Sequence, residues 1–161
     1  MAGDLKQKFG SSGQTLTITL ASLANNSARA SAAVDNSSNL YSDVLLFLKL
    51  KSAGSGTVST GYVNVYAYGS VDGGTTYSEG VSGSDASVTL TSPPNVRLIG
   101  VVAMVATSTT YYSPVMSVAS AFGGVMPASW GIIIENKSGG AFDSTEGNHA
   151  KLYQGVLAQY T

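Results

Sequence analysis

Residues 61–77, GYVNVYAYGSVDGGTTY, contain the pattern that decides the fold. From Tyr62 to Tyr68, small apolar residues alternate with tyrosine and asparagine, which is the period-two pattern of a strand with one apolar and one aromatic, hydroxyl-bearing face. The glycines that follow supply the positive φ angles that a tight reversal needs. The stretch therefore predicts a half-buried β-strand that ends in a turn.

Eight further short segments continue this strand-and-turn pattern. They span residues 14–20, 28–34, 42–51, 87–90, 96–105, 111–120, 130–135 and 151–160. Turn signals separate them every ~8–12 residues without helical periodicity. Segment 96–105 is mostly apolar on both faces, which predicts a place in the middle of the fold. We predict an all-β protein, a single antiparallel β-sandwich of about eight or nine strands, with jelly-roll connectivity favoured over an immunoglobulin-like order.

The length of 161 residues suits one domain with one core. Residues 1–13 contain glycine, serine and lysine without any periodicity, so they are expected to form a flexible N-terminal arm unless something docks it. Residues 14–161 are expected to form the β-sandwich domain. In an assembling protein such an arm reaches neighbouring molecules, which makes Lys6 and Phe9 candidate interface residues.

Only 11% of the residues are charged and the net charge is -1, so the surface must consist mainly of Ser, Thr, Asn, Gly and Tyr. Such a surface repels its own copies weakly, which favours a homo-oligomer or packing against other proteins. The eight basic residues are scattered, so nucleic acid is not an expected partner. No apolar run approaches ~18 residues, so no membrane contact is expected.

Catalytic and metal-binding motifs are weakly represented. His149 is the only histidine, and no G-x-S-x-G elbow accompanies it, so a surface loop histidine is preferred over a catalytic or metal-ligating one. Asp72, Asp85, Asp143 and Glu146 are acids on expected loops, and calcium remains open only if they converge at one end of the sandwich. The chain contains no cysteine, and we expect no catalytic residue, metal or cofactor.

The segment SVDGGTTY at 70–77 fits the pattern S-x-D-x-G-x-T-aromatic and resembles the Asp-box turns of sialidases and of bacterial and viral adhesion modules. Asp72 is expected to accept hydrogen bonds from turn amides, and Gly73 and Gly74 to permit left-handed backbone. In those proteins the motif is a structural turn away from the active site. The resemblance therefore implies a structural turn.

The tyrosines are the most prominent candidate contact residues. Tyr62, Tyr66 and Tyr68 share one expected strand face, and Tyr111 and Tyr112 lie on another strand. Such rings can pack between subunits, form a cross-strand ladder within the sheet, or stack against a sugar. We favour subunit contact, with sheet stabilisation and glycan binding as the alternatives.

Four blocks of the chain resemble small virion proteins of tailed bacteriophages. They are YVNVYAYGSVDGGTTYSEGVSGSDA, SPPNVRLIGVV, SVASAFGGVMPASWGIIIENKSG and KLYQGVLAQY. The resemblance covers roughly residues 16–161. It implies a structural, non-enzymatic protein located in the virion.

Within that class, the resemblance implies a capsid decoration or cement protein that bridges capsid subunits, with the major capsid protein as its main partner. The arm and the open sheet edges would then make the contacts. The alternative is a β-sandwich module of the tail, collar or fibre that contacts other tail proteins or host surface glycans.

Overall fold

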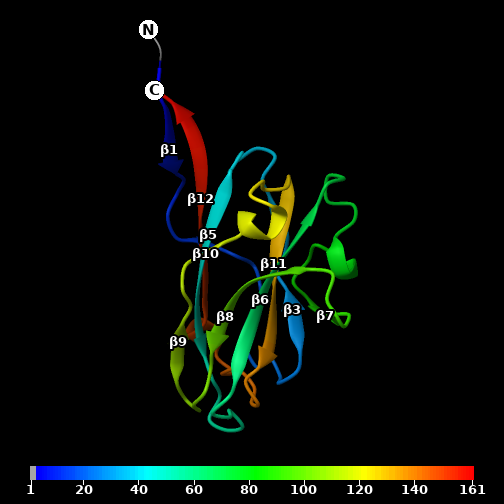
Figure 1. Cartoon of the computed structure of the whole chain (residues 1–161). Helices are drawn as coiled ribbons and strands as arrows, with labels where there is room; N and C mark the ends of the chain where they lie inside the picture. The colour runs from blue at the N-terminus through cyan, green and yellow to red at the C-terminus, as the bar shows by residue number, and fades with distance from the viewer. Residues whose placement is uncertain (1–2) are drawn as a thin grey trace.

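Two antiparallel β-sheets pack face to face in the computed structural model, which describes residues 3–161 (Figure 1). Sheet A consists of β1 (Leu5–Phe9), β2 (Gln14–Thr15), β5 (Asp43–Lys51), β9 (Thr110–Tyr112), β10 (Met116–Ser117) and β12 (Ala150–Tyr160). Sheet B consists of β3 (Ala28–Ala30), β4 (Val34–Asp35), β6 (Tyr62–Ser70), β7 (Ala86–Val88), β8 (Arg97–Ala103) and β11 (Ser129–Lys137). The predicted all-β antiparallel sandwich is confirmed.

The connections contain three short 3₁₀ turns. They are η1 (Ser78–Gly80), η2 (Ala119–Phe122) and η3 (Glu146–Asn148). No helix among the described residues is long and apolar enough to cross a membrane.

The strands follow a regular spatial order. Sheet A runs β1-β12-β5-β10 and sheet B runs β7-β3-β11-β6-β8. Three pairs of short strands lie along a single neighbour: β1 and β2 along β12, β3 and β4 along β11, and β9 and β10 along β5. Merging these pairs reduces the twelve segments to nine. With β7 set aside and the other eight numbered in chain order, sheet A reads 1-8-3-6 and sheet B reads 2-7-4-5.

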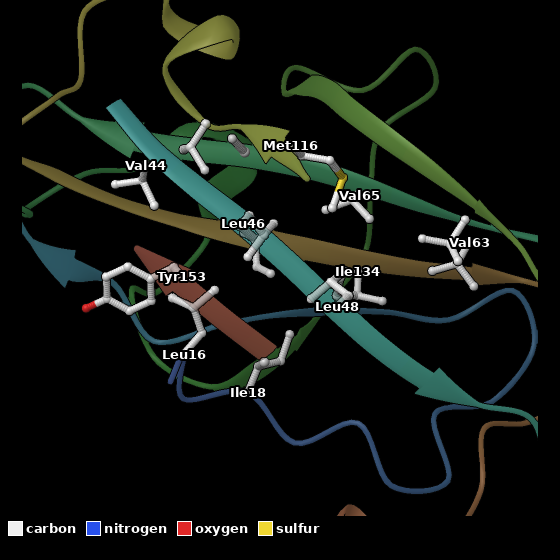
Figure 2. Packing of buried hydrophobic residues seen from close by; sticks show 14 of the residues in the cluster. Leu16, Ile18, Val44, Leu46, Leu48, Val63, Val65, Met116, Ile134 and Tyr153 are labelled. Atoms are coloured by element: carbon white, nitrogen blue, oxygen red, sulfur yellow. The ribbon is translucent and has the colours of Figure 1, made fainter. Parts of the chain in front are cut away.

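The main core lies between the two sheets, and β5 shows how the sequence builds it. Its even-numbered residues from Val44 to Leu50 are fully buried, while its odd-numbered residues point away from the core. Leu46 and Leu48 of β5 belong to the same buried cluster as Ile134 of β11 (Figure 2). The ring of Tyr153 on β12 meets Trp130 on β11 edge to face at 5.5 Å, so aromatic packing also joins the sheets.

The outer face of sheet B is covered by residues 71–96, which we call the flap. The flap leaves β6, carries η1 and β7, and returns to β8. A second apolar cluster beneath it contains Tyr66, Tyr68 and Ile133 of the sheet together with Val81 of the flap. The part of sheet B beneath the flap is therefore covered on both faces, which accounts for the almost wholly buried β11.

Strand β8 lies at the edge of sheet B, so the predicted central position of residues 96–105 is wrong. Val102 is buried in the main core, whereas Leu98 and Val101 on the other face are about half exposed. The flap covers the outer face of the sheet over β3, β11 and part of β6 but leaves these two residues in solvent. The second apolar face of β8 is therefore a partly exposed face of an edge strand and not the second buried face of a central strand.

Residues 5–9 form the strand β1. Leu5–Phe9 pair with Val156–Tyr160, and these two segments together make what we call the terminal ribbon. β5 pairs with β12 only up to Val156, so the ribbon runs past the other strands at one end of the molecule (Figure 1). The expected flexible arm is thus docked on the last strand of the same chain over residues 5–9, while residues 1–2 lie outside the described residues.

Candidate contact surface

The outer face of sheet A carries an apolar patch that no layer of the described chain covers. Leu45 and Phe47 alternate with the buried residues of β5, and Leu152 lies opposite Phe47 in the neighbouring strand. Paired residues of adjacent strands share a face, so these three side chains lie together. Tyr112 stacks on Phe47 with ring centroids 6.3 Å apart, and Val115 is 64% exposed beside them. We call these five residues the sheet A face.

A shallow hollow of about 220 Å³ lies in the sheet A face. Its apolar lining comes from Leu45, Phe47, Val115 and Leu152. One-sided antiparallel sheets usually present polar residues to solvent. The apolar hollow departs from this usual pattern, and its strand residues Leu45, Phe47 and Leu152 remain partly exposed.

The terminal ribbon extends the sheet A face beyond the sandwich. Phe9 pairs with Val156 and Leu5 pairs with Tyr160, which places these residues on the same side as Leu152 by strand alternation. Leu5 and Tyr160 are each about 70% exposed, and Phe9 is 54% exposed. A two-stranded ribbon is marginally stable when it has nothing to pack against. The ribbon thus adds an exposed apolar surface to the sheet A face.

Lys6 and Lys8 lie on the opposite face of the ribbon. They alternate with Leu5 and Phe9 along β1, whose outer edge is unpaired among the described residues. Lysine on an edge strand disfavours unwanted pairing with another strand. The two faces of the ribbon are therefore chemically different, one apolar and one cationic.

Tyr66 and Tyr68 do not lie on an exposed face. Tyr68 is fully buried and Tyr66 is only 8% exposed, because the flap covers them. Burial raises the pKa of Tyr68 to about 12, and burial together with the Glu135 charge raises the pKa of Tyr66 to about 12. Neither ring is available to a partner, so the expectation that they form an interface is corrected.

The other candidate residues fall in different places. Tyr111 points inward, and its hydroxyl accepts hydrogen bonds from the N–H groups of Val105 and Ala106 at 3.1 and 2.6 Å. Tyr62 is 41% exposed at the outer side of sheet B, opposite Lys137 in register. The structure therefore brings together Phe9 and Tyr112 on one continuous surface and leaves Tyr62 on another.

Sequence reasoning missed the centre of the sheet A face. Leu45 and Phe47 share a strand face with Lys49 and Lys51, and this mixture of apolar and charged residues does not by itself indicate a contact surface. The available signal was that β5 has apolar residues on both faces. Only the structure shows that nothing in the described chain covers the second one.

A polar cluster lies on the outer side of sheet B. Glu135 Oε2 accepts hydrogen bonds from Asn64 Nδ2 at 2.9 Å and from the Tyr66 hydroxyl at 3.1 Å, while Lys137 Nζ lies 3.1 Å from Oε1. Burial raises the pKa of Glu135, but the hydrogen bonds from Asn64, Lys137 and Tyr66 outweigh it and leave that pKa lowered. Glu135 and Lys137 also line a groove of about 350 Å³. The cluster joins β6 to β11 at the side of this groove.

The turn at 70–77 has the local geometry that its sequence suggests. Asp72 Oδ1 accepts hydrogen bonds from the N–H groups of Thr75 and Thr76 at 3.1 and 3.0 Å, and Gly73 and Gly74 have φ values of 74° and 88°. Hydrogen bonds from Ser70 and Thr76 lower the pKa of Asp72. The flap begins at this turn, so the turn does not connect β6 directly to a neighbouring strand of the sheet.

His149 is 5% exposed and is held at both ring nitrogens. Nδ1 accepts a hydrogen bond from the Lys51 N–H at 3.3 Å, so Nε2 carries the proton and donates to the Asp143 carbonyl at 3.1 Å. Burial lowers the pKa of His149, which favours this neutral form. The imidazole therefore serves as a structural link and has no free nitrogen, so the expected surface position is corrected.

The four loop acids considered for calcium are engaged separately. Asp72 accepts hydrogen bonds within its own turn, Asp85 pairs with Arg29, Asp143 pairs with Lys51, and Glu146 pairs with Lys151. Within residues 3–161, no three acid, histidine or cysteine side chains are grouped so as to hold a metal ion.

No protein-family model matches the chain, and no curated protein or solved structure is significantly similar to it. The fold and the contact surface define a β-sandwich in which the flap covers part of the outer face of sheet B and no described layer covers the outer face of sheet A.

Proposed function

We propose that this chain is a non-enzymatic structural protein of a tailed-bacteriophage particle, in the role of a capsid decoration or cement protein. The observation that carries this proposal is the apolar sheet A face, extended by the terminal ribbon. Exposed apolar surface of this kind is characteristic of protein–protein contact sites. The low charge of the chain adds little repulsion to such contacts.

The strand order supports a virion role. Orders of 1-8-3-6 and 2-7-4-5 in two packed sheets are those of two interlocked Greek keys, so we interpret the fold as a jelly roll with β7 added at one edge. Jelly rolls are frequent in viral capsid and lectin domains. This interpretation is consistent with the resemblance of the sequence blocks to small virion proteins.

In the proposed mechanism, each copy bridges neighbouring subunits of the particle and adds interface area between them. Contacts made through Leu45, Phe47 and Val115 gain stability by burying apolar surface. Summed over many copies, this area makes the shell harder to open. The rigid sandwich fixes the direction in which each copy presents its contact surface.

The alternative location is the tail, collar or fibre, where the chain would contact other tail proteins or a host glycan. The polar groove beside Glu135 and Lys137, with Tyr62 close by in register, is the observation that favours this alternative. Carboxylate and ammonium groups bind sugar hydroxyls, and an exposed ring can stack on a sugar.

The experiment is re-addition of purified chain to particles that lack it. We expect the wild-type chain to bind the capsid and to raise the temperature at which packaged DNA is released. Val115→Asp should bind more weakly, because it places a charge in the sheet A face. Val71→Asp is the matched control, since Val71 is fully exposed in the flap. Absence of capsid binding by the wild-type chain would overturn the decoration proposal, and binding to tails would favour the alternative.

A further inference from the structure

We infer that the groove beside Glu135 and Lys137 binds an uncharged oligosaccharide. The groove has a volume of about 350 Å³ and lies on the outer side of sheet B, where the start of β3, the end of β11 and residues 87–90 of the flap line it. This inference goes beyond the proposed function, because it assigns a ligand to a surface that a capsid decoration protein does not need for its contacts.

A small residue between two larger ones creates the groove. Ala28 pairs with Val88 of β7 on one side and with Glu135 of β11 on the other, so the three side chains form one row across the sheet. The methyl group of Ala28 fills little of the space between its neighbours and forms the floor. A volume of about 350 Å³ lies within the range of ~300–1,000 Å³ that is usual for small-molecule sites.

The two walls of the groove differ in chemistry. Val88 and Leu90 line the wall on the side of β7, and both pack against the apolar cluster beneath the flap. Glu135 and Lys137 line the wall on the side of β11. A sugar ring has the same division, since its C–H groups form an apolar face and its hydroxyls form a polar rim. The groove therefore matches a sugar ring better than a ligand that is polar or apolar throughout.

The polar wall is held in place by the protein itself. Asn64 and Tyr66 donate hydrogen bonds to Oε2 of Glu135 at 2.9 and 3.1 Å. Lys137 Nζ lies 3.1 Å from Oε1 of Glu135 and donates to Asn26 Oδ1 at 3.4 Å. The hydrogen bonds to Glu135 lower its pKa, so the carboxylate is ionised at neutral pH. Groups that are already ordered lose less freedom when a ligand binds.

One donor and one acceptor of this wall remain available side by side. An ammonium group has three N–H donors, and a carboxylate accepts at about four positions. Glu135 and Asn26 engage two donors of Lys137, while Asn64, Tyr66 and Lys137 engage three acceptor positions of Glu135. The remaining N–H and the remaining lone pair suit two neighbouring hydroxyls of one sugar, of which one accepts and the other donates.

The charges of the groove favour an uncharged ligand. Glu135 and Lys137 neutralise each other, and no other lining residue in the described part of the chain is charged. An anion attracted by one of them would be repelled by the other, and the same holds for a cation. Ser27, Ser87 and Thr89 add hydroxyl-bearing residues to the lining. A neutral ligand that is rich in hydroxyls gains hydrogen bonds here without electrostatic opposition.

An exposed aromatic ring extends the site across β11. Tyr62 of β6 lies opposite Lys137 in register and is 41% exposed. Since β11 lies between β3 and β6 and neighbouring strands are ~4.8 Å apart, β6 lies ~10 Å from β3. A second sugar unit can then stack on the ring of Tyr62 while the first occupies the groove. The ligand is therefore an oligosaccharide of two or more units.

Strand addition of a peptide suits this site less well. The groove borders β7, the edge strand of sheet B, which contains only the three residues Ala86–Val88. So short an edge offers few backbone hydrogen bonds to an added strand. The side-chain groups of the groove are therefore its main means of recognition.

The groove and the sheet A face lie on opposite sides of the sandwich. One is on the outer side of sheet B and the other is on the outer side of sheet A. A chain that is bound to a particle through the sheet A face would therefore present the groove to the surroundings. Sugar binding and particle binding are compatible in one molecule.

An NMR titration of the ¹⁵N-labelled full chain tests the inference. The probes are neutral tetrasaccharides of glucose, galactose, mannose and N-acetylglucosamine, with sialyllactose as the charged comparison. We expect at least one neutral probe to give saturable shifts of the backbone amide signals of Ala28, Val88 and Glu135. The inference would be overturned if no neutral probe shifted these signals, or if sialyllactose alone did so.

Two variants test the assigned contacts with the probe that binds best. Lys137→Met removes the available N–H donor and should weaken binding ~10-fold. Tyr62→Ala removes the stacking ring and should weaken binding ~5-fold. Lys49→Met is the matched control, because Lys49 lies on sheet A and does not line the groove. Equal affinities of Lys137→Met, Tyr62→Ala and Lys49→Met would overturn the inference.

The sugar titration and the particle-binding experiment fail independently. A chain that binds capsids but no neutral sugar would overturn this inference and leave the proposed function intact. A chain that binds a neutral sugar in the groove but binds no particle would support this inference and remove the proposed function alone.

Discussion

The hydroxyl of Tyr68 donates a 2.6 Å hydrogen bond to the backbone carbonyl of Ser31 in the buried layer between sheet B and the flap. This bond joins β6 to the residue that follows β3 on the side of the sandwich that the flap covers. The sheet A face on the other side has no such cover. Tyr68→Phe removes the donor but keeps the ring, so we expect a loss of about 1–2 kcal/mol in the free energy of unfolding.

Urea denaturation followed by the fluorescence of Trp130, the only tryptophan, measures this loss. The control is Tyr112→Phe, since Tyr112 is 66% exposed and its change should stay within ~0.5 kcal/mol. Equal stability of Tyr68→Phe and the wild type would show that the fold does not depend on this bond.

Alkaline pH should weaken the fold through the two buried tyrosines. The pKa values of Tyr66 and Tyr68 are raised to about 12, against ~10 for a free tyrosine. Both hydroxyl groups hold their proton more tightly in the folded state than in the unfolded state. Their contribution to the free energy of unfolding is therefore complete below pH ~10 and falls as the pH rises toward 12.

Phenolate absorbance during a pH titration checks this prediction. The exposed tyrosines should ionise first. The absorbance change of the last ionisation step should be smaller in the Tyr66→Phe/Tyr68→Phe variant than in the wild type. Ionisation of all tyrosines in one step near pH 10 would contradict the buried positions of Tyr66 and Tyr68.

Glu146 forms an ion pair with the buried Lys151 near the start of β12. The Lys151 side chain is 9% exposed, and Glu146 Oε2 also accepts hydrogen bonds from the N–H groups of Leu20 and Ala21 at 2.8 and 2.7 Å. Glu146→Gln leaves the ammonium group without its counter-charge. We expect the free energy of unfolding to fall by about 2 kcal/mol. This is less than for a fully buried ion pair, because the Glu146 side chain is 39% exposed.

A double-mutant cycle separates this charge effect from packing. Glu146→Gln combined with Lys151→Met should recover most of the lost stability, since no unpaired charge remains. Chemical denaturation of the four proteins gives the interaction energy. Independent, additive losses would argue that the pair is not coupled.

His149 should take up a proton at a lower pH than a free imidazole does. Burial lowers its pKa below the usual 6.5, so its contribution to stability is complete above pH 6.5 and is lost as the pH falls through the lowered pKa. Since it is the only histidine, a single imidazole resonance reports its titration by NMR. A midpoint at or above 6.5 would contradict the burial of the imidazole.

Local patterns predicted those parts of the fold that depend on alternation. The buried face of β5 follows from the alternation that includes Val44 and Leu46. Leu16 and Ile18 are also buried as alternation predicts, although strand β2 ends at Thr15. The turn at Asp72 follows from local hydrogen bonding.

Contacts between distant parts of the chain were not predictable in the same way. The burial of Tyr66 depends on the flap, which reads as a polar loop because its few apolar residues, such as Val81 and Val88, are widely spaced. The pairing of Leu5 with Tyr160 joins the two ends of the sequence, and no local propensity encodes it. The openness of the sheet A face is likewise a property of the whole fold.

The number of copies of this chain in purified particles, measured by quantitative mass spectrometry against the major capsid protein, tests the proposed function most directly. A decoration protein should be present at a fixed ratio near one copy per capsid subunit or one per few, because capsid symmetry repeats its binding site. A ratio equal to that of tail components, or absence from the particles, would contradict the decoration role.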